Sequence, residues 1–243
     1  LERKLVDFTA IILAAGKGTR MKSTVPKVLH EIAKLPILGH VLNLTKDLGI
    51  NAPTVVIGQG AQEVESYVRS KEKDAICVVQ NKQLGTGNAL ECAKDTLANY
   101  DGNLIILYGD VPFIEKKTIL EMLEKVKQGA DLAVLGFNTE NPKNYGRLIM
   151  GTDNIISEIV EEKETNSSQK EIKICNAGIY RGSSKLIFSV LENITNKNKS
   201  DEFYLTDIVK VISDKGLKTQ LVLSNSEETQ GINSKKDLAR AEV

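Results

Sequence analysis

A glycine-rich stretch followed by basic residues stands near the N-terminus of the chain. It runs from Leu13 to Met21 (LAAGKGTRM), directly after an apolar run, Phe8–Ile12, that is typical of a buried strand. Glycines let a backbone approach a ligand closely, exposed amides bind anions, and Lys and Arg side chains neutralise charge. The stretch favours a phosphate-binding turn; the alternative is a strand-to-helix turn with a solvated basic rim.

An acidic residue, Asp110, follows a second apolar strand and is preceded by Gly109. A carboxylate in that position can bind a hard cation such as Mg²⁺, which takes few protein oxygens and completes its shell with phosphates and water. The alternative is that Asp110 caps the turn before Val111 and Pro112. Beside a phosphate-binding turn, the metal-site interpretation is favoured.

Gln80 and the segment Gly85-Thr86-Gly87 combine a side-chain amide with a backbone that a ligand can approach. An amide both donates and accepts hydrogen bonds, which suits the imide edge of a base such as uracil. A helix N-cap by Thr86 is the alternative, and the two roles are compatible.

Lys27 follows Pro26 in a segment that the proline could stiffen. An ammonium group beside a reacting α-phosphate would stabilise the charge that accumulates during an in-line displacement. The alternative is a solvated surface lysine. Further along, small polar clusters follow strand ends, and Glu161 and Asn176 there could bind sugar hydroxyls or an amide. These clusters are Tyr145-Gly146-Arg147, Glu161, Asn176-Ala177-Gly178 and Gly231-Ile232-Asn233.

The elements that must position these residues alternate between β-branched apolar runs and amphipathic stretches, which predicts a parallel sheet with helices on both faces. Ligands of such sheets bind beyond the carboxyl ends of the strands. The pattern predicts strands at 8–14, 54–57, 75–80, 104–108 and 132–137, and helices at 37–48, 62–68, 87–97 and 116–127.

After residue 137 the pattern changes to a hairpin around the turn-rich tetrad 151–154, followed by a polar segment, 164–170, that we expect to be a mobile surface loop. No run of hexapeptide repeats is present. The remaining expected elements are strands at 172–180 and 217–223 and helices at 184–191, 204–213 and 235–241.

Composition limits the classes of function. The 243 residues carry a formal net charge of zero, which argues against a general nucleic-acid binder, and no apolar run approaches the ~20 residues of a membrane span. Residues 1–7 do not resemble a secretory signal. Three isolated cysteines without zinc-type pairing, Cys77, Cys92 and Cys175, suit reduced thiols in a cytoplasmic protein, and His30 and His40 are expected to be structural.

Taken together, the motifs closely resemble the uridylyltransferase domain of the bacterial bifunctional N-acetylglucosamine-1-phosphate uridylyltransferase and glucosamine-1-phosphate acetyltransferase family. The resemblance covers nearly the whole chain, in order. The first block is shared by many sugar nucleotidyltransferases, whereas LGTGNA, YGDVP and GIN are more specific. The matching blocks are LAAGKGTRM (13–21), PKVLH (26–30), Gln80 with LGTGNA (84–89), YGDVP (108–112), YGR (145–147), IVEEK (159–163), NAGIY (176–180), YLTD (204–207) and GIN (231–233).

The resemblance implies an α/β, Rossmann-like nucleotidyltransferase fold (GT-A-like), with a mixed, mainly parallel central sheet and a smaller sugar-binding lobe. A single nucleotidyltransferase domain would span 1–243, with a nucleotide-binding half at 8–137, a sugar-binding half at 138–233 and a terminal helix at 234–243. No left-handed β-helix is expected, and therefore neither acetyltransferase activity nor the trimer that the β-helix normally provides; the chain as given would be a monomer or weak oligomer.

The resemblance also implies a role for each candidate residue. Asp110 and Asn233 would bind a catalytic Mg²⁺, Arg20 would contact the departing pyrophosphate, and Lys27 would contact the phosphates at the reacting centre. The uridine would be held by Leu13, Ala14, Ala15, Gly16, Gln80, Gly85 and Thr86, and the N-acetylglucosamine site would be lined by Tyr108, Gly146, Glu161, Asn176 and Thr206, with Gly109 completing the substrate-binding set.

The implied reaction is direct attack by N-acetylglucosamine 1-phosphate on the α-phosphorus of UTP, with release of pyrophosphate and without a covalent enzyme intermediate. Two alternatives stay open: a transferase for another nucleotide or sugar 1-phosphate, and a nucleotide-sugar-binding module without turnover. Joint retention of Arg20, Lys27, Asp110 and Asn233 argues against the second. A Rossmann dehydrogenase is disfavoured because the glycine spacing is not GxGxxG.

Overall fold

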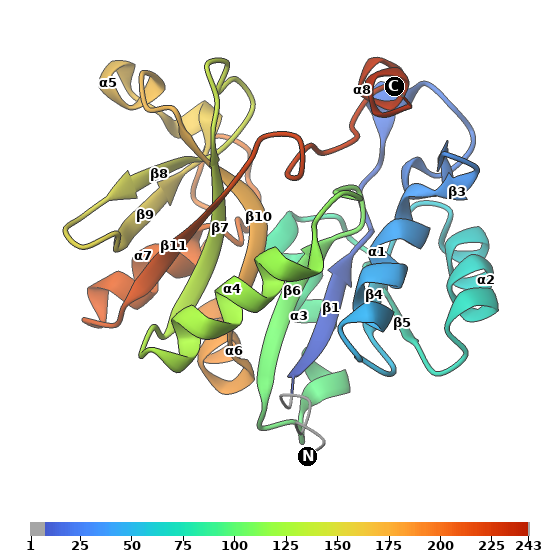
Figure 1. The fold of residues 1–243 in the computed structure, drawn as a ribbon, viewed down its shortest axis with the longest axis horizontal. Coiled ribbons are helices and arrows are strands. Elements are labelled where there is room, and N and C mark those ends of the chain that lie inside the picture. Colours follow the sequence, from blue (N-terminus) through green and yellow to red (C-terminus); the bar gives the residue numbers. More distant parts are fainter. Residues whose placement is uncertain (1–7, 243) are drawn as a thin grey trace.

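The computed structural model describes residues 8–242, in which helices cover both faces of a mixed sheet (Figure 1). In these residues the main path of the sheet has the order β11-β7-β10-β6-β1-β4-β5. The mixed, mainly parallel α/β class that the sequence predicts is confirmed. The strands of this path are β1 (Phe8–Leu13), β4 (Thr54–Ile57), β5 (Ile76–Val79), β6 (Asn103–Tyr108), β7 (Leu132–Asn138), β10 (Ile174–Ser183) and β11 (Thr219–Ser224).

Parallel pairing brings the carboxyl ends of β1 and β6 together. Leu13, the last residue of β1, is in register with Tyr108, the last residue of β6, and β4 and β5 continue the parallel order on the other side. The segments that follow these strands therefore emerge at one edge of the sheet. β10 is antiparallel to both β6 and β7 and joins the parallel pair β7–β11 to the rest.

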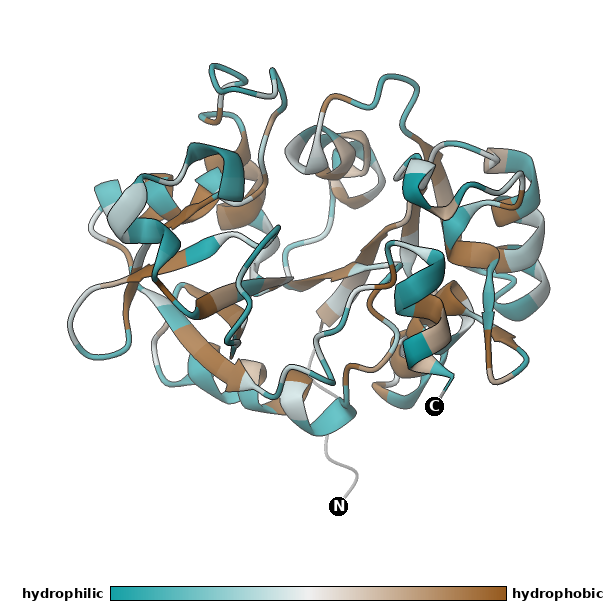
Figure 2. Ribbon diagram, turned by 90° about the horizontal axis from the view of Figure 1, so that it is seen from above, coloured by the Kyte–Doolittle hydropathy of each residue, from teal (hydrophilic) through white to brown (hydrophobic). Residues whose placement is uncertain are grey.

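Helices pack on the two faces because their apolar residues recur at helical spacing and point to the sheet. In α4, for example, Ile119, Met122 and Leu123 are buried, and in α7 the same holds for Ile208 and Ile212. Figure 2 shows the hydrophobic strands between the more polar helices. One face carries α1 (Ile37–Asp47), α2 (Ala61–Lys71) and α4 (Lys116–Lys127); the other carries α3 (Thr86–Cys92), α6 (Ser184–Leu191) and α7 (Asp207–Asp214).

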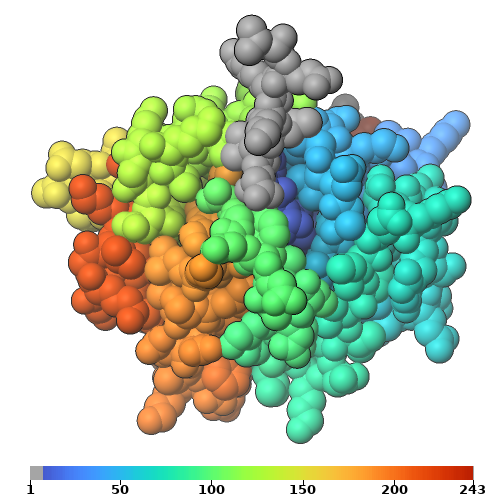
Figure 3. Space-filling model, turned by 90° about the horizontal axis from the view of Figure 1, so that it is seen from below, coloured from blue at the N-terminus to red at the C-terminus, as the bar shows by residue number. Residues whose placement is uncertain are grey.

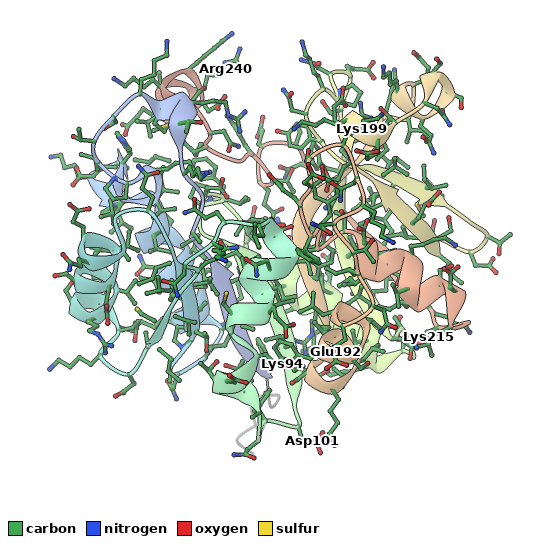
Figure 4. All side chains as sticks on the ribbon, turned by 180° about the vertical axis from the view of Figure 1, so that it is seen from behind. Lys94, Asp101, Glu192, Lys199, Lys215 and Arg240 are labelled. Atoms are coloured by element: carbon green, nitrogen blue, oxygen red, sulfur yellow. The ribbon has the colours of Figure 1, made fainter. Side chains whose placement is uncertain are left out.

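On the second face the chain around residue 100 lies against the chain around residue 190, coloured green and orange in the view from below (Figure 3). At this boundary the Lys94 ammonium nitrogen is 2.6 Å from a Glu192 carboxylate oxygen; both residues are labelled in Figure 4. The pair is exposed, so its contribution to stability is small.

The expected hairpin forms as β8 (Arg147–Met150) and β9 (Ile156–Val160), which pair with each other and, through β8, with β10. The expected loop 164–170 instead contains a helical turn, α5 (Ser167–Lys170), with a capping box between Asn166 and Gln169. Its sequence is polar, but the cap satisfies the first backbone amides and so favours helix.

Most expected elements form with boundaries shifted by one to three residues, and two helices and one short hairpin differ more clearly. The helix expected at 204–213 begins at Asp207, and the one expected at 87–97 ends at Cys92 and continues as a 3-10 turn, Lys94–Leu97. The short hairpin β2 (Glu31–Ile32) and β3 (Leu35–Pro36) was not expected, because two-residue strands carry no periodic pattern.

The C-terminal segment returns from β11 to the side of the molecule formed by the first part of the chain (Figure 1). The terminal helix α8 (Lys235–Ala241) forms where it is predicted, and its start is capped by the Ser234 hydroxyl, which accepts from the Asp237 amide. Ile232, near the end of this returning segment, is buried in one cluster with Ile32 and Ile37. The fold therefore depends on the end of the chain to cover its first half.

A β-bulge in β10 places Gly178 beneath Tyr108. Gly178 has a φ of 80°, and a Cβ atom there would lie 2.3 Å from the Tyr108 ring. Gly216 has a similar φ of 73° but no atom within 4 Å of such a Cβ.

We predict that Gly178→Ala lowers the free energy of unfolding by about 1–3 kcal/mol from backbone strain alone, with a further loss from the clash. Gly216→Ala is the matched control, since it has the strain without the clash. Urea unfolding of both variants measures the difference; equal losses would show that Tyr108 does not constrain this bulge.

Candidate functional site

A cleft of about 380 Å³ opens at the carboxyl ends of β1 and β6. Most of the residues predicted to bind nucleotide lie together in its wall, which is formed by five separate segments of the chain. The lining residues are Leu13, Ala14, Ala15, Gly16, Lys17, Lys27, Val28, Gln80, Gln83, Gly85, Thr86, Ala89, Tyr108, Asp110 and Glu202.

At one end of the cleft a single ammonium group contacts both residues predicted to bind metal. Lys27 Nζ forms an ion pair with Asp110 Oδ2 and donates to Asn233 Oδ1 over 3.2 Å. The Lys27 and Asp110 side chains are only 11% and 15% exposed. Asn233 is held in turn by the C-terminal helix, because the backbone N–H of Asn233 donates to Asp237 Oδ2 at 3.1 Å.

The glycine-rich turn packs directly on Lys27. Gly18 has a φ of 60°, and a Cβ atom there would lie 2.7 Å from the Lys27 Cβ. On the neighbouring strand, a Cβ atom at Gly109 would lie 2.9 Å from the Ala14 Cβ. Both glycines therefore permit a close approach of backbone segments, which brings Lys27 and Asp110 to the end of the cleft.

The opposite end of the cleft is built around the Gln80 amide. Gln80 Nε2 donates to the Gly85 carbonyl oxygen at 3.0 Å and to Asn88 Oδ1 at 2.8 Å. These bonds use the nitrogen and fix the direction of the side chain. Gln83, which sequence reasoning missed, also lies here and donates to the Ala15 carbonyl oxygen at 3.0 Å.

Thr86 does not act as an N-cap. The cap position of α3 is Gly85, and no side chain there bonds the first amides. The Thr86 hydroxyl instead accepts from the Leu205 amide at 3.0 Å, so it joins the two halves of the chain. The sequence could not distinguish these roles, because Leu205 is remote along the chain.

A second group of predicted residues, here the sugar-side cluster (Gly146, Glu161, Asn176 and Thr206), lies in the second half of the chain. A Cβ atom at Gly146 would lie 3.7 Å from both Glu161 Oε1 and the Asn176 Cβ. The backbone N–H of Asn176 donates to the Gly146 carbonyl oxygen at 2.9 Å. Thr206 donates its hydroxyl to Glu161 Oε1 at 2.9 Å. The structure thus brings all four together.

Tyr108 lies between the cleft and the sugar-side cluster. Burial raises the pKa of its hydroxyl, the nearby Glu161 carboxylate raises it further, and a hydrogen bond with Thr86 acts in the opposite direction. A tyrosine with such neighbours stays protonated and can donate a hydrogen bond.

Burial raises the pKa of two carboxyl groups in this region. Burial raises the pKa of Glu161, while the hydrogen bond from Thr206 lowers it. Burial also raises the pKa of the adjacent Asp207 to about 6, with a smaller contribution from Glu164. Perturbed carboxyl groups of this kind gather at functional sites more often than elsewhere.

Residues 202–206 connect the two groups. The Phe203 backbone N–H donates to the Leu84 carbonyl oxygen, and the Phe203 carbonyl oxygen accepts from the Gly87 backbone N–H. Both bonds are 2.8 Å long. Within the same segment, Glu202 lines the cleft. Sequence reasoning missed Glu202, because nothing in its local pattern separates it from a solvated acidic residue.

Arg20 lies outside the cleft wall. It is exposed within a 3-10 turn, Thr19–Met21. Burial raises the pKa of Tyr145, and the positive charge of Arg20 acts weakly in the opposite direction. Arg20 therefore lies near the boundary of the two halves, beside the cleft and not within it.

The cleft is not the largest hollow of the described residues. A groove of about 1110 Å³ lies between α4 and β11 and contains none of the predicted site residues. Residues 8–242 contain no helix long and apolar enough to cross a membrane. They also contain no cluster of three or more His, Cys, Asp or Glu residues arranged to hold a metal ion.

Comparison with known proteins places the chain in a family. The family model described as the MobA-like NTP transferase domain matches residues 10–172, which is more than half of the chain. The chain belongs to this family. All the lining residues of the cleft except Glu202 lie within the matched residues.

Two curated relatives, both named Bifunctional protein GlmU, are each 40% identical to this chain and cover 96% of it. They come from Roseobacter denitrificans and Parvibaculum lavamentivorans, and the chain spans about half of their lengths, 51% and 52%. The resemblance predicted from the motifs is thereby confirmed. With the family model, these relatives support a sugar-phosphate nucleotidyltransferase.

The solved structure of UDP-glucose pyrophosphorylase from Acinetobacter baumanii has the same fold, with a TM-score of 0.75 and 19% identity. The match covers 96% of this chain and 91% of that chain. The predicted nucleotidyltransferase fold is confirmed; the roles of the individual site residues stay predictions.

Asp207 gives a prediction about pH. Since its pKa in the folded protein, about 6, lies above the ordinary value of 3.8 for an aspartate, the folded state binds the proton more tightly than the unfolded state. Stability then decreases as pH rises from about 4 to about 6. Asp207→Asn should remove this part of the slope, whereas Asp153→Asn, at an exposed turn, should retain it. Thermal unfolding across this range measures both, and parallel slopes in all three proteins would contradict the prediction.

Proposed function

We propose that the protein transfers the uridylyl group of UTP to N-acetylglucosamine 1-phosphate and releases pyrophosphate. The observation that carries the proposal is the contact of Lys27 with Asp110 and Asn233, at the end of a cleft whose other end carries the Gln80 amide. A cationic end suits a triphosphate, and an amide end suits a base. The sugar-side cluster lies on the other side of Tyr108 from this cleft, where a sugar phosphate could approach.

Uracil is the base that the amide end favours. Because Gln80 Nε2 already donates to two protein oxygens, the carbonyl oxygen of the amide is the group left to face the cleft. A carbonyl oxygen accepts from the N3–H of uracil, whereas cytosine presents an acceptor at that position.

A divalent cation fits Asp110 and Asn233. Their side-chain oxygens are hard donors, they converge on one point, and two protein oxygens are what Mg²⁺ usually takes beside phosphates and water. When bound, the metal would neutralise charge on the triphosphate. We propose Mg²⁺ as the resident ion.

The residues of the chain would supply positioning and charge. Lys27 would leave the two oxygens and bind phosphate oxygens at the reacting centre, where charge accumulates. Arg20, exposed beside the cleft, would attract the departing pyrophosphate. The attacking sugar phosphate is already an anion, so no general base is needed, which agrees with the absence of histidine among the lining residues of the cleft.

Pyrophosphate release tests the proposal when each NTP is crossed with several sugar 1-phosphates, with and without Mg²⁺. We expect turnover with UTP and N-acetylglucosamine 1-phosphate that depends on the metal. Folded protein that is inactive with this pair would contradict the proposal, and preference for another pair would favour the alternative nucleotidyltransferases.

Lys27 and the metal would share the same two oxygens, so they should compete. We predict that Lys27→Met binds Mn²⁺ more tightly than the unchanged protein in the absence of nucleotide, while turnover falls on the order of a hundredfold. Asp110→Asn is the opposite control, because it should weaken Mn²⁺ binding. Titration followed by electron paramagnetic resonance measures both. Weaker Mn²⁺ binding by Lys27→Met would contradict the shared site.

A further inference from the structure

Arg147, on β8, is a buried cation with two fixed partners. Its side chain is 2% exposed, and Nη2 lies 2.6 Å from Glu162 Oε2. Nη1 donates to the Tyr145 carbonyl oxygen. A buried charge is tolerated only when it is paired and hydrogen-bonded. The guanidinium therefore cannot leave these partners without a large loss.

The backbone of Arg147 lies where three strands meet. It is in register with Val160 on β9 and with Cys175 on β10. Glu161 follows Val160, Asn176 follows Cys175 and Gly146 precedes Arg147. All three belong to the sugar-side cluster. A shift of Arg147 would thus move three members of the cluster relative to one another.

The guanidinium also joins the two segments that flank the cluster. Tyr145 precedes β8, and Glu162 begins a 3-10 turn, Glu162–Glu164, directly after β9. Because an arginine fork can contact two acceptors at once, it fixes the distance between these segments. A lysine at this position could reach only one acceptor with the same geometry.

We propose that Arg147 is a positioning residue that sets the affinity of the protein for its sugar 1-phosphate, by holding Gly146, Glu161 and Asn176 in the arrangement that binds the sugar. The proposal rests on the proposed function. Arg147 is too deeply buried to contact the sugar, so it acts through its ion pair with Glu162.

Steady-state kinetics test the proposal in Arg147→Met, Arg147→Lys and the milder Glu162→Gln. We expect the KM for N-acetylglucosamine 1-phosphate to rise about tenfold or more in Arg147→Met, because small displacements of binding groups are costly. The KM for UTP should stay within about twofold, since the nucleotide cleft does not use the pair. Arg147→Lys and Glu162→Gln should give smaller rises of the same kind.

A merely structural role would change different quantities. It would lower the melting temperature and the amount of active protein, without separating the two KM values. Equal changes in both KM values, or unchanged KM values in folded Glu162→Gln and Arg147→Lys, would overturn the proposal. Lys173→Met is the control: it removes an exposed ion pair with Glu140 just before β10 and should alter neither KM.

Amide hydrogen exchange separates this proposal from the proposed function. The Asn176 amide, which donates to the Gly146 carbonyl oxygen at 2.9 Å, should exchange faster in Glu162→Gln, while the amides of β1 are unchanged. If the unchanged protein does not turn over the expected sugar phosphate, the proposed function fails and this exchange measurement alone decides the positioning role. Unaltered protection at Asn176 would then overturn it.

Discussion

One ammonium group, that of Lys27, holds together three parts of the chain that are far apart in sequence. Its partner Asp110 is 83 residues away, and Asn233 is 206 residues away. The contact requires β1 and β6 to end side by side, and it requires the C-terminal segment to return across the first half. The parallel register of β1 and β6 meets the first condition, and the burial of Ile232 meets the second.

The contact also explains why several small residues are needed around it. Two anionic or polar oxygens and an ammonium are brought out of most of the solvent, which is favourable only with good geometry. Gly18 and Gly109 leave room for the backbone to approach, because a side chain at Gly18 would collide with Lys27 and one at Gly109 with Ala14. Gly178 likewise leaves room for the Tyr108 ring, which lies beside the sugar-side cluster.

The two binding regions are mechanically connected. Residues 202–206 bond to the loop before α3 through backbone groups and through the Thr86 hydroxyl, and the next side chain, Thr206, bonds to Glu161. A short series of hydrogen bonds therefore joins the loop before α3 to the sugar-side cluster.

The sequence predicted the regular elements and most of the cleft, because these depend on local patterns and on strand ends. Asp110 and Gln80 could be placed since each follows an apolar strand. What it could not predict depends on partners remote in sequence. Thr86 bonds to a distant amide in place of a helix cap, and Gln83 and Glu202 enter the cleft from loops without a pattern. In the sequence Arg147 stands out only as part of a motif, since its burial and its ion pair with Glu162 arise from the packing of β8.

The most direct test of the account is a crystal structure of the protein with a non-hydrolysable UTP analogue and Mg²⁺. We predict a metal ion about 2.1 Å from an oxygen of Asp110 and from Asn233 Oδ1, with Lys27 Nζ released from both and bound to a phosphate oxygen. A metal ion bound elsewhere, or a Lys27 that stays paired with Asp110 beside the bound nucleotide, would contradict the account.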